Sequence, residues 1–252
     1  MWERRSGGLV LTFHLAGINN QNFLMRDDQT GSYWQQITGA ALSGPLAGRR
    51  LTLVASDELS FGLWAAEEPE GTVLKGVAKY ASDYAEKDWE VKMKKERTVL
   101  SFANPALGLE ARTLMLGIQA SGASRAYLLD AVLRDKLVLD HVGSEPVVLV
   151  VGPDGQSVRV FRDRLPGQEG ESAFYRIFDD KPSHPKDAAW LKQVATAPLL
   201  MDEATGSQWD FQGCAVSGKL QGACLEPVEA IKDYWFDWRN YNPNTTVYTG
   251  KQ

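Results

Sequence analysis

The sequence has little of what metal and haem proteins need. Its 252 residues contain only two cysteines and three histidines, with no His-Glu-x-x-His or Cys-x-x-Cys motif. A structural zinc site needs four such ligands at close spacing, so neither a metal site nor covalent haem is expected. No cofactor is predicted, because Walker A and Gly-x-Gly-x-x-Gly sequences are also absent.

Long apolar runs and an excess of positive charge are missing too. The longest aliphatic run is Val147–Val151, far short of the roughly 20 residues in a membrane-spanning helix. Lys and Arg number 27 against 32 Asp and Glu, for a net charge of −5. The one basic cluster, Lys92–Arg97, fits a solvated face, so no nucleic-acid partner and no membrane span are expected.

What the chain does have is apolar and aromatic content. Hydrophobic residues make up 44% of the sequence, and 8 residues are Trp. This is enough to bury the core of one large domain or two small ones, and it excludes a disordered chain.

An internal repeat organises the chain. Leu24–Gly76 returns as Leu199–Gly250 with one residue deleted, and 19 of the 52 aligned residues are identical. Unrelated segments would share roughly 3. The match indicates a duplicated structural unit.

The local patterns predict a mainly β (α+β) fold of antiparallel sheets and hairpins with short helices. In each copy an Asp-rich turn joins two strands, and a short helix ends before Pro69 or Pro243. Further elements are predicted from turn and periodicity signals: strands at 51–54, 72–74 and 246–248, helices at 128–133 and near 187–194, and hairpins at 114–127 and 146–161. The predicted organisation is a partial first repeat unit at 1–77, a connector at 78–113 and a more complete second unit at 114–252, all possibly fused in one pseudo-symmetric domain.

Several motifs resemble the bacterial family called domain of unknown function 3179 (DUF3179). The motifs lie along most of the chain: Leu11-Thr12-Phe13, Asp27–Trp34, Ala41–Gly48, Leu116–Leu128, Tyr234–Trp238 and Thr246-Val247-Tyr248. The resemblance implies common ancestry rather than a particular activity.

The chain departs from that family pattern at one turn. The resemblance implies a Cys-Pro-Leu-Cys-Gly turn after a Val-rich strand, whereas Gly152-Pro153-Asp154-Gly155 stands here without cysteine. A His-Glu pair expected upstream is missing, and only Asp140 remains of a local Asn-Asp. Any thiol or metal chemistry of these groups would be lost in this chain.

Two sets of repeated side chains are candidate site residues. Asp27 and Asp202 occupy equivalent positions; they could face each other as a catalytic carboxylate pair, or each could hold its own turn. Repeated or clustered tryptophans could stack on a ligand or anchor a core. They are Trp34, Trp209, Trp235 and Trp238. The Tyr234–Trp238 cluster is the leading candidate for exposed aromatics, since a short helix cannot bury every ring on one face.

The two cysteines, Cys214 and Cys224, bracket the Ser-Gly loop of the second copy. Their equivalents in the first copy are Ala40 and Arg50. This joint presence suggests a disulfide and an oxidising compartment, although two free core thiols fit equally well.

Three functions fit these observations. The first is a non-catalytic, β-rich binding or structural module located outside the cytoplasm, in the periplasm or exported, whose signal lies outside this chain. The second is a hydrolase using the paired carboxylates. The third is an accessory subunit that binds another protein through exposed aromatics.

Overall fold

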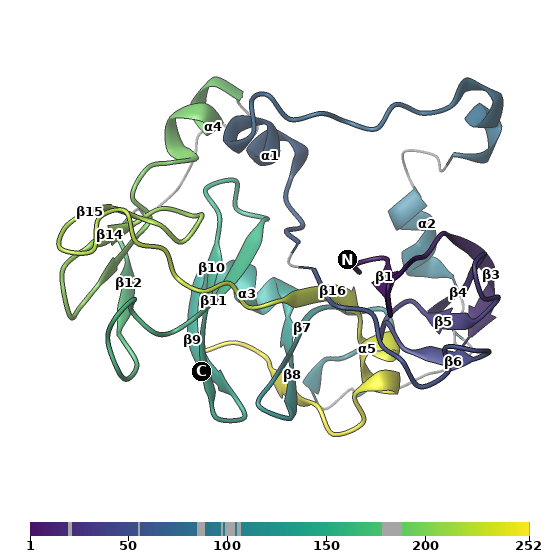
Figure 1. The fold of residues 1–252 in the computed structure, drawn as a ribbon. Coiled ribbons are helices and arrows are strands. Elements are labelled where there is room, and N and C mark those ends of the chain that lie inside the picture. The colour runs from purple at the N-terminus through teal and green to yellow at the C-terminus, as the bar shows by residue number, and fades with distance from the viewer. Residues whose placement is uncertain are drawn as a thin grey trace. The chain divides into compact units, whose positions relative to one another are not determined.

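A computed structural model describes residues 1–19, 22–54, 56–84, 89–96, 98, 104, 107–177 and 188–251. Two compact units divide the chain (Figure 1). Unit 1 comprises Met1–Ser56, Thr98–Thr113 and Tyr234–Pro243. Unit 2 comprises Asp57–Arg97, Leu114–Asp233 and Asn244–Gln252.

Unit 1 contains a four-stranded sheet, in which neighbouring strands are antiparallel and follow the chain order β3-β4-β5-β6. A two-stranded ribbon and one helix accompany it. The elements are β1 (Arg5–Ser6), β2 (Leu9–Val10), β3 (Phe13–Asn19), β4 (Asn22–Asp27), β5 (Tyr33–Gln35), β6 (Ala41–Ser43) and α5 (Trp235–Tyr241).

Unit 2 contains three sheets with the strand orders β11-β10-β9, β12-β13-β14-β15 and β16-β7-β8-β17. Strands pair antiparallel at β9–β10–β11, β12–β13–β14–β15 and β7–β8, whereas β17 lies parallel to β8. The strands are β7 (Leu114–Ala120), β8 (Ala123–Leu128), β9 (Leu137–Val142), β10 (Glu145–Val151), β11 (Val158–Arg162), β12 (Phe174–Arg176), β13 (Leu200–Asp202), β14 (Gln208–Trp209), β15 (Ala215–Ser217), β16 (Ala230–Tyr234) and β17 (Thr246–Tyr248). The helices are α1 (Phe61–Glu67), η1 (Ala78–Asp83), α2 (Trp89–Lys95), α3 (Leu129–Asp135) and α4 (Ala188–Val194).

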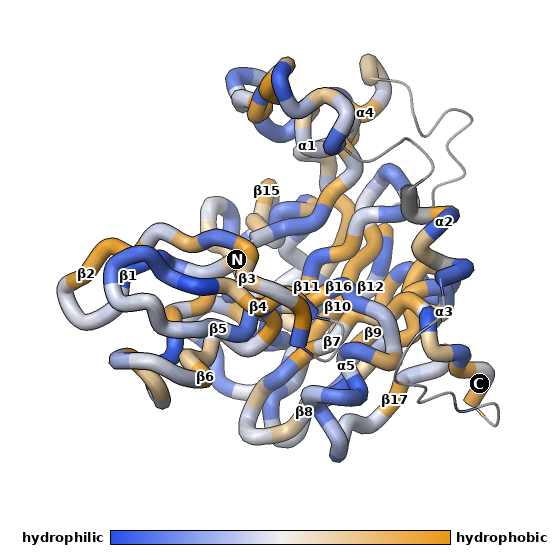
Figure 2. Tube along the Cα trace, turned by 90° about the vertical axis from the view of Figure 1, so that its right-hand side faces the viewer, coloured by the Kyte–Doolittle hydropathy of each residue, from blue (hydrophilic) through white to orange (hydrophobic). Residues whose placement is uncertain are grey.

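Buried strands explain the core of unit 2. The β10 residues Pro146–Val151 are all buried, and Figure 2 shows hydrophobic colouring around β10 and its neighbours. Val148 and Val150 contribute to one cluster with Trp209, whereas Val147 and Leu149 contribute to a second. Because alternate residues of a strand point to opposite faces, β10 supplies both clusters.

Helix α1 illustrates how the sequence sets an element's ends. The Ser60 hydroxyl accepts a hydrogen bond from the Leu63 N–H at 3.3 Å, which satisfies a donor of the first turn. The helix ends at Glu67, two residues before Pro69, a residue that disfavours helical geometry in its predecessor.

The predicted fold class is confirmed in its coarse form: the chain is mainly β with short helices and several mostly antiparallel sheets. The predicted hairpins and helices also form. Helix α4 begins at Ala188, while Asp187 lies outside the described residues.

Two strand predictions need correction. Thr72–Leu74 is not a strand, because no partner strand lies beside it among the described residues. Of the predicted strand 51–54, only an isolated bridge between Leu53 and Trp2 is formed.

Candidate functional site

The carboxylate of Asp27 lies inside the β4–β5 turn of unit 1. It accepts hydrogen bonds from the Thr30 backbone N–H at 2.6 Å and from the Trp34 indole N–H at 2.8 Å. The Thr30 hydroxyl donates to it at 2.9 Å and also lies 2.7 Å from the Ser32 hydroxyl. The side chain of Asp27 is thus part of a closed network within one turn.

Asp202 makes the same network in the β13–β14 turn of unit 2. Its carboxylate accepts from the Thr205 N–H at 2.6 Å, the Thr205 hydroxyl at 2.8 Å and the Trp209 indole at 3.0 Å. The Thr205 and Ser207 hydroxyl oxygens are 2.7 Å apart. Each of the two candidate carboxylates therefore binds the backbone and side chains of its own turn.

Both carboxylates are completely buried. Burial alone would raise the pKa of Asp27, but hydrogen bonds from Trp34 and Thr30 outweigh it, and the pKa lies below its ordinary value. A carboxylate held ionised by fixed donors and closed off from water is suited to stabilising a turn. It has no exposed oxygen with which to reach a substrate.

A second serine-dependent contact closes each loop. The Ser32 hydroxyl accepts from the Leu46 N–H, and the Ser207 hydroxyl accepts from the Leu220 N–H, both at 3.0 Å. Gly218 has φ of +92°, and a Cβ there would lie 2.6 Å from the Cα of Ser207. The loop thus requires glycine both for its backbone angle and for its close approach.

The candidate stacking residues Trp34 and Trp209 are also completely buried. Each packs edge-on against a phenylalanine two strands away in its sheet, Trp34 against Phe13 of β3 and Trp209 against Phe174 of β12. The ring centroids are 5.8 Å and 6.1 Å apart. Such edge-to-face pairs are favourable for aromatic rings in a core. Their positions fit core anchors and leave no free ring face.

Helix α5 does not expose the aromatics expected there. Trp235, Phe236 and Trp238 are all buried, so the expectation of an exposed patch at these positions is wrong. Arg112 lies over the ring of Phe236 at 5.4 Å. The Trp235 and Phe236 N–H groups donate to the carbonyls of Thr113 and Ala111, so a segment distant in sequence lies against the start of this helix.

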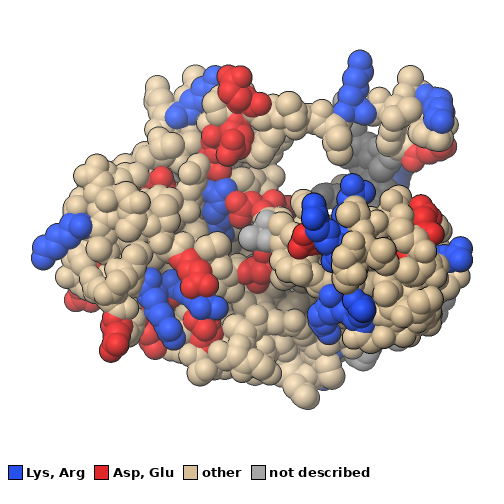
Figure 3. Space-filling view, in the orientation of Figure 1, with Lys and Arg blue, Asp and Glu red and all other residues tan. Residues whose placement is uncertain are grey.

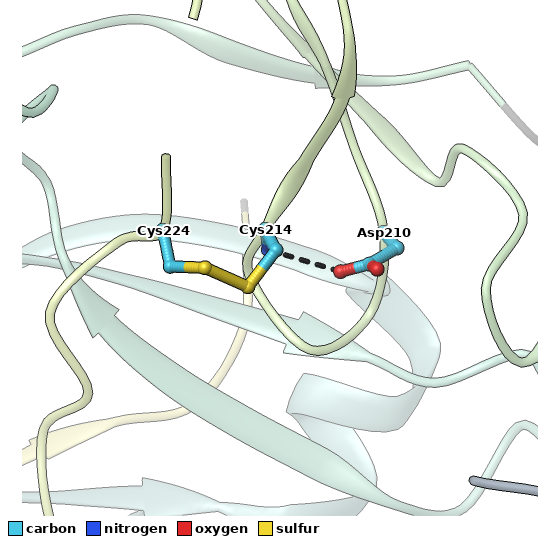
Figure 4. Close-up of a disulfide and its surroundings, with 3 residues drawn as sticks. All are labelled: Asp210, Cys214 and Cys224. Atoms are coloured by element: carbon cyan, nitrogen blue, oxygen red, sulfur yellow. Dashed lines mark hydrogen bonds between the residues drawn. A yellow bond between two sulfur atoms is a disulfide. The ribbon is translucent and has the colours of Figure 1, made fainter. Parts of the chain in front are cut away.

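The two cysteines of unit 2 are joined by a disulfide, Cys214–Cys224 (Figure 4). The two residues also form an isolated antiparallel bridge, and the Cys214 N–H donates to the Asp210 carboxylate at 2.9 Å. Ala40 and Arg50 of unit 1, which align with the two cysteines in the sequence, form the same kind of isolated antiparallel bridge without sulfur. The loop geometry is therefore attainable with or without the cross-link.

The turn at residues 152–155, where the family resemblance implies cysteines, is stabilised by hydrogen bonds between Asp154 and Ser157. Asp154 accepts from the Ser157 backbone N–H at 3.0 Å and from its hydroxyl at 2.5 Å, and both residues are buried. The Gly152 N–H donates to the Ser157 carbonyl at 2.8 Å. A carboxylate–hydroxyl pair thus stabilises this turn.

Arg159 forms an ion-pair cluster that no local sequence pattern predicts. The Arg159 guanidinium on β11 makes two parallel 2.8 Å hydrogen bonds to Glu67 of α1, lies 2.7 Å from Asp57 and covers the ring of Phe211. These residues are about 50 to 100 positions apart, so no local pattern predicts the contact. With its donors engaged, the guanidinium fixes α1 to the sheet.

Arg125 of β8 is the centre of a second polar cluster. Arg125 donates to Asp140 of β9 at 2.6 Å and to the Thr246 hydroxyl of β17 at 3.1 Å. Arg125 and Asp140 were distinguished in the sequence only through the family resemblance. The geometry shows that they join three strands of unit 2.

A protein-family model matches residues 1–245, and its description is Protein of unknown function (DUF3179). The chain belongs to the DUF3179 family. This confirms the resemblance inferred from its motifs. No curated protein and no solved structure matches the sequence.

Among the described residues of this DUF3179 chain, no group of three or more His, Cys, Asp or Glu could hold a metal ion. No described helix is long and apolar enough to cross a membrane. Figure 3 shows acidic and basic side chains interspersed on the face drawn, without one continuous basic area.

Proposed function

We propose that this DUF3179 chain is a non-catalytic β-rich module with a binding or structural role outside the cytoplasm. The observation that carries the proposal is the burial of Asp27 and Asp202 inside complete hydrogen-bond networks of their own turns. Carboxylates in this state stabilise the fold and are poorly placed for acid–base catalysis.

The proposal includes an internal duplication. Its support is the agreement of independent details between the copies: the Asp–Thr–Ser–Trp network, the edge-on phenylalanine, the serine-closed loop and the bridge at the loop base. The strand orders β3-β4-β5-β6 and β12-β13-β14-β15 also agree. Convergence on all of these within one chain would require several coincidences.

Location in an oxidising compartment is part of the same proposal. Disulfides persist outside the reducing cytosol, and the Cys214–Cys224 bond closes a short loop of unit 2. The absence of sulfur at Ala40 and Arg50 makes this bond an added stabiliser rather than a requirement of the loop.

A hydrolase remains the competing function, and paired substitutions distinguish the two. Asp27→Asn and Asp202→Asn each lose a charge-assisted acceptor for an indole N–H, and each should cost about 1.5–3 kcal/mol of unfolding free energy. If the carboxylates act only in their own turns, the double variant should equal the sum of the single variants to about 0.5 kcal/mol. Chemical denaturation measures all three values.

The matched controls are Asp28→Asn and Glu203→Gln, at the positions that directly follow the two buried carboxylates. Both side chains are exposed, so their removal should change stability by about 1 kcal/mol or less. Strong coupling between the Asp27 and Asp202 variants, or wild-type stability in both, would contradict the structural role and favour a shared site.

A further inference from the structure

The segment Thr72–Leu74 lies exposed in unit 2, where Figure 1 draws the chain leaving α1 as an extended tube. Val73 is 65% exposed and Leu74 is 100% exposed. Within the described ranges this segment belongs to no sheet. A β-branched and apolar sequence held open to water in this way is typical of a strand that lacks its neighbour.

The second copy shows what covers the equivalent residues. Thr246–Tyr248, aligned with Thr72–Leu74, forms β17 and pairs in parallel with β8. The register places Thr246 opposite Arg125, Val247 opposite Ala126 and Tyr248 opposite Tyr127. The Tyr127 and Tyr248 rings are 5.5 Å apart, so this pairing buries aromatic surface as well as satisfying backbone groups.

Thr72–Leu74 and Thr246–Tyr248 each follow a helix, α1 and α5 respectively, that ends in the same way. The Glu68 N–H closes α1 by donating to the Trp64 carbonyl at 2.8 Å, and the Asn242 N–H closes α5 by donating to the Trp238 carbonyl at 2.9 Å. In each copy the strand sequence Thr-Val begins five residues after the last helical residue. The sequence match thus continues through the helix end into the exposed segment.

We propose that Thr72–Leu74 is a docking strand that adds in parallel to the edge of a β-hairpin presented by a partner protein. The inference rests on the proposed duplication. The acceptor edge should resemble β8 of the β7–β8 hairpin. It should place a small residue opposite Val73 and an apolar or aromatic residue opposite Leu74, because Ala126 and Tyr127 of β8 lie opposite Val247 and Tyr248. Strand addition of this type is an established mode of recognition.

A partner with a vacant edge fits better than an intact second copy. In this chain the outer edge of β8 is already occupied by β17, because the sheet order ends β7-β8-β17. A second copy would have to displace its own β17, which Arg125 and Asp135 hold through Thr246 and Tyr248. The acceptor edge must therefore come from a chain in which it is uncovered.

A vacant edge of known sequence can be made from this protein by ending the chain at Pro243, which removes β17. In sedimentation velocity, this 1–243 chain should self-associate as its exposed Thr72–Leu74 strand adds to the β8 edge of another molecule. The intact chain should remain monomeric.

Val73→Pro in the 1–243 chain should weaken association by about tenfold or more, because proline removes a strand donor. Leu9→Asp, at another exposed apolar residue, should leave it unchanged.

If the 1–243 chain has low stability, binding of added peptides is measured instead of self-association. Peptides of residues 71–77 and 244–250 are each added to the 1–243 chain, and thermal unfolding is followed. Both should raise the unfolding temperature, and a Val73→Pro version of the first should not. Stabilisation by the 244–250 peptide alone, or self-association insensitive to Val73→Pro, would overturn the proposal.

Self-association of the intact chain that Val73→Pro abolishes would also overturn it, since the partner would then be a second copy. These outcomes are separate from the test of the proposed function. Additivity of Asp27→Asn and Asp202→Asn concerns the turns, and it would stand even if Thr72–Leu74 bound no acceptor.

Discussion

At the scale of single residues, buried carboxylates in this protein fall into two electrostatic classes. Asp27 is surrounded by donors, so its pKa is lowered despite burial. Asp237, on α5, has a raised pKa because burial outweighs the one hydrogen bond that Asn22 donates to it at 2.9 Å. Its second oxygen is buried and has no hydrogen-bond partner among the described residues. The number of donors, rather than depth, decides which state is favoured.

Asp237→Asn should therefore stabilise the protein at neutral pH. A folded-state pKa above the unfolded value means that the contribution of Asp237 is greatest below the unfolded pKa and is lost as pH rises through the folded pKa. The substitution should raise the unfolding temperature at pH 7 and lose most of that advantage at about pH 3.5, below the unfolded pKa, where the carboxyl group is mostly protonated in both states. Thermal unfolding across this pH range measures it.

Glu110→Gln is the control, since this carboxylate lies in the same unit and is exposed. It should show no comparable gain. A loss of stability at pH 7 in Asp237→Asn would mean that the ionised carboxylate has a favourable partner and would refute this explanation.

At the scale of elements, local signals were sufficient for hairpins and short helices. The Asp-Thr-Gly turns, the Ser60 cap and the prolines after α1 and α5 all act within a few residues. The sequence does not predict features that depend on a contact with a segment distant along the chain. Thr72–Leu74 has strand composition but belongs to no sheet among the described residues. The rings of α5 are buried, and Arg112, which covers Phe236, is distant in sequence. The Arg159–Glu67 pair was missed for the same reason.

The cross-linked loop gives a prediction at this scale. Replacing both Cys214 and Cys224 with serine should cost about 2–3 kcal/mol, the unfolded-state entropy of a loop of roughly ten residues. The loop itself should still form, because Ala40 and Arg50 bridge without sulfur. Denaturant titration gives the free energy, and hydrogen exchange reports the loop.

The converse substitution is its control. Ala40→Cys with Arg50→Cys should form a new disulfide in unit 1, visible as resistance to alkylation until a reductant is added. Failure of these thiols to pair, together with collapse of the serine variant, would show that the two loops are not equivalent.

At the scale of the whole molecule, the chain forms two compact units with separate hydrophobic clusters. Trp34 anchors the cluster of unit 1, whereas Trp209 belongs to a cluster of unit 2. Because the disulfide lies in unit 2, beside Ala215 and Leu225 of the Trp209 cluster, its loss should act on that cluster and not on the Trp34 cluster.

Reduction should therefore act unevenly. With Cys214–Cys224 reduced, hydrogen exchange should accelerate across Leu200–Leu225, while Asp27–Leu51 keeps its protection. Mass spectrometry of peptides from both segments in one sample makes each the reference for the other. Equal loss of protection in both would show that the units unfold as one cooperative body.

The bonding of the Trp34 and Trp209 indoles to buried carboxylates has a spectroscopic consequence. Each indole is completely buried and donates a hydrogen bond to a carboxylate, and the two belong to different units. The chain has 8 Trp, so the difference in fluorescence between the intact chain and a Trp34→Phe or Trp209→Phe variant reports the replaced indole. The protein thus carries a natural optical label for each half of its architecture, with no dye attached.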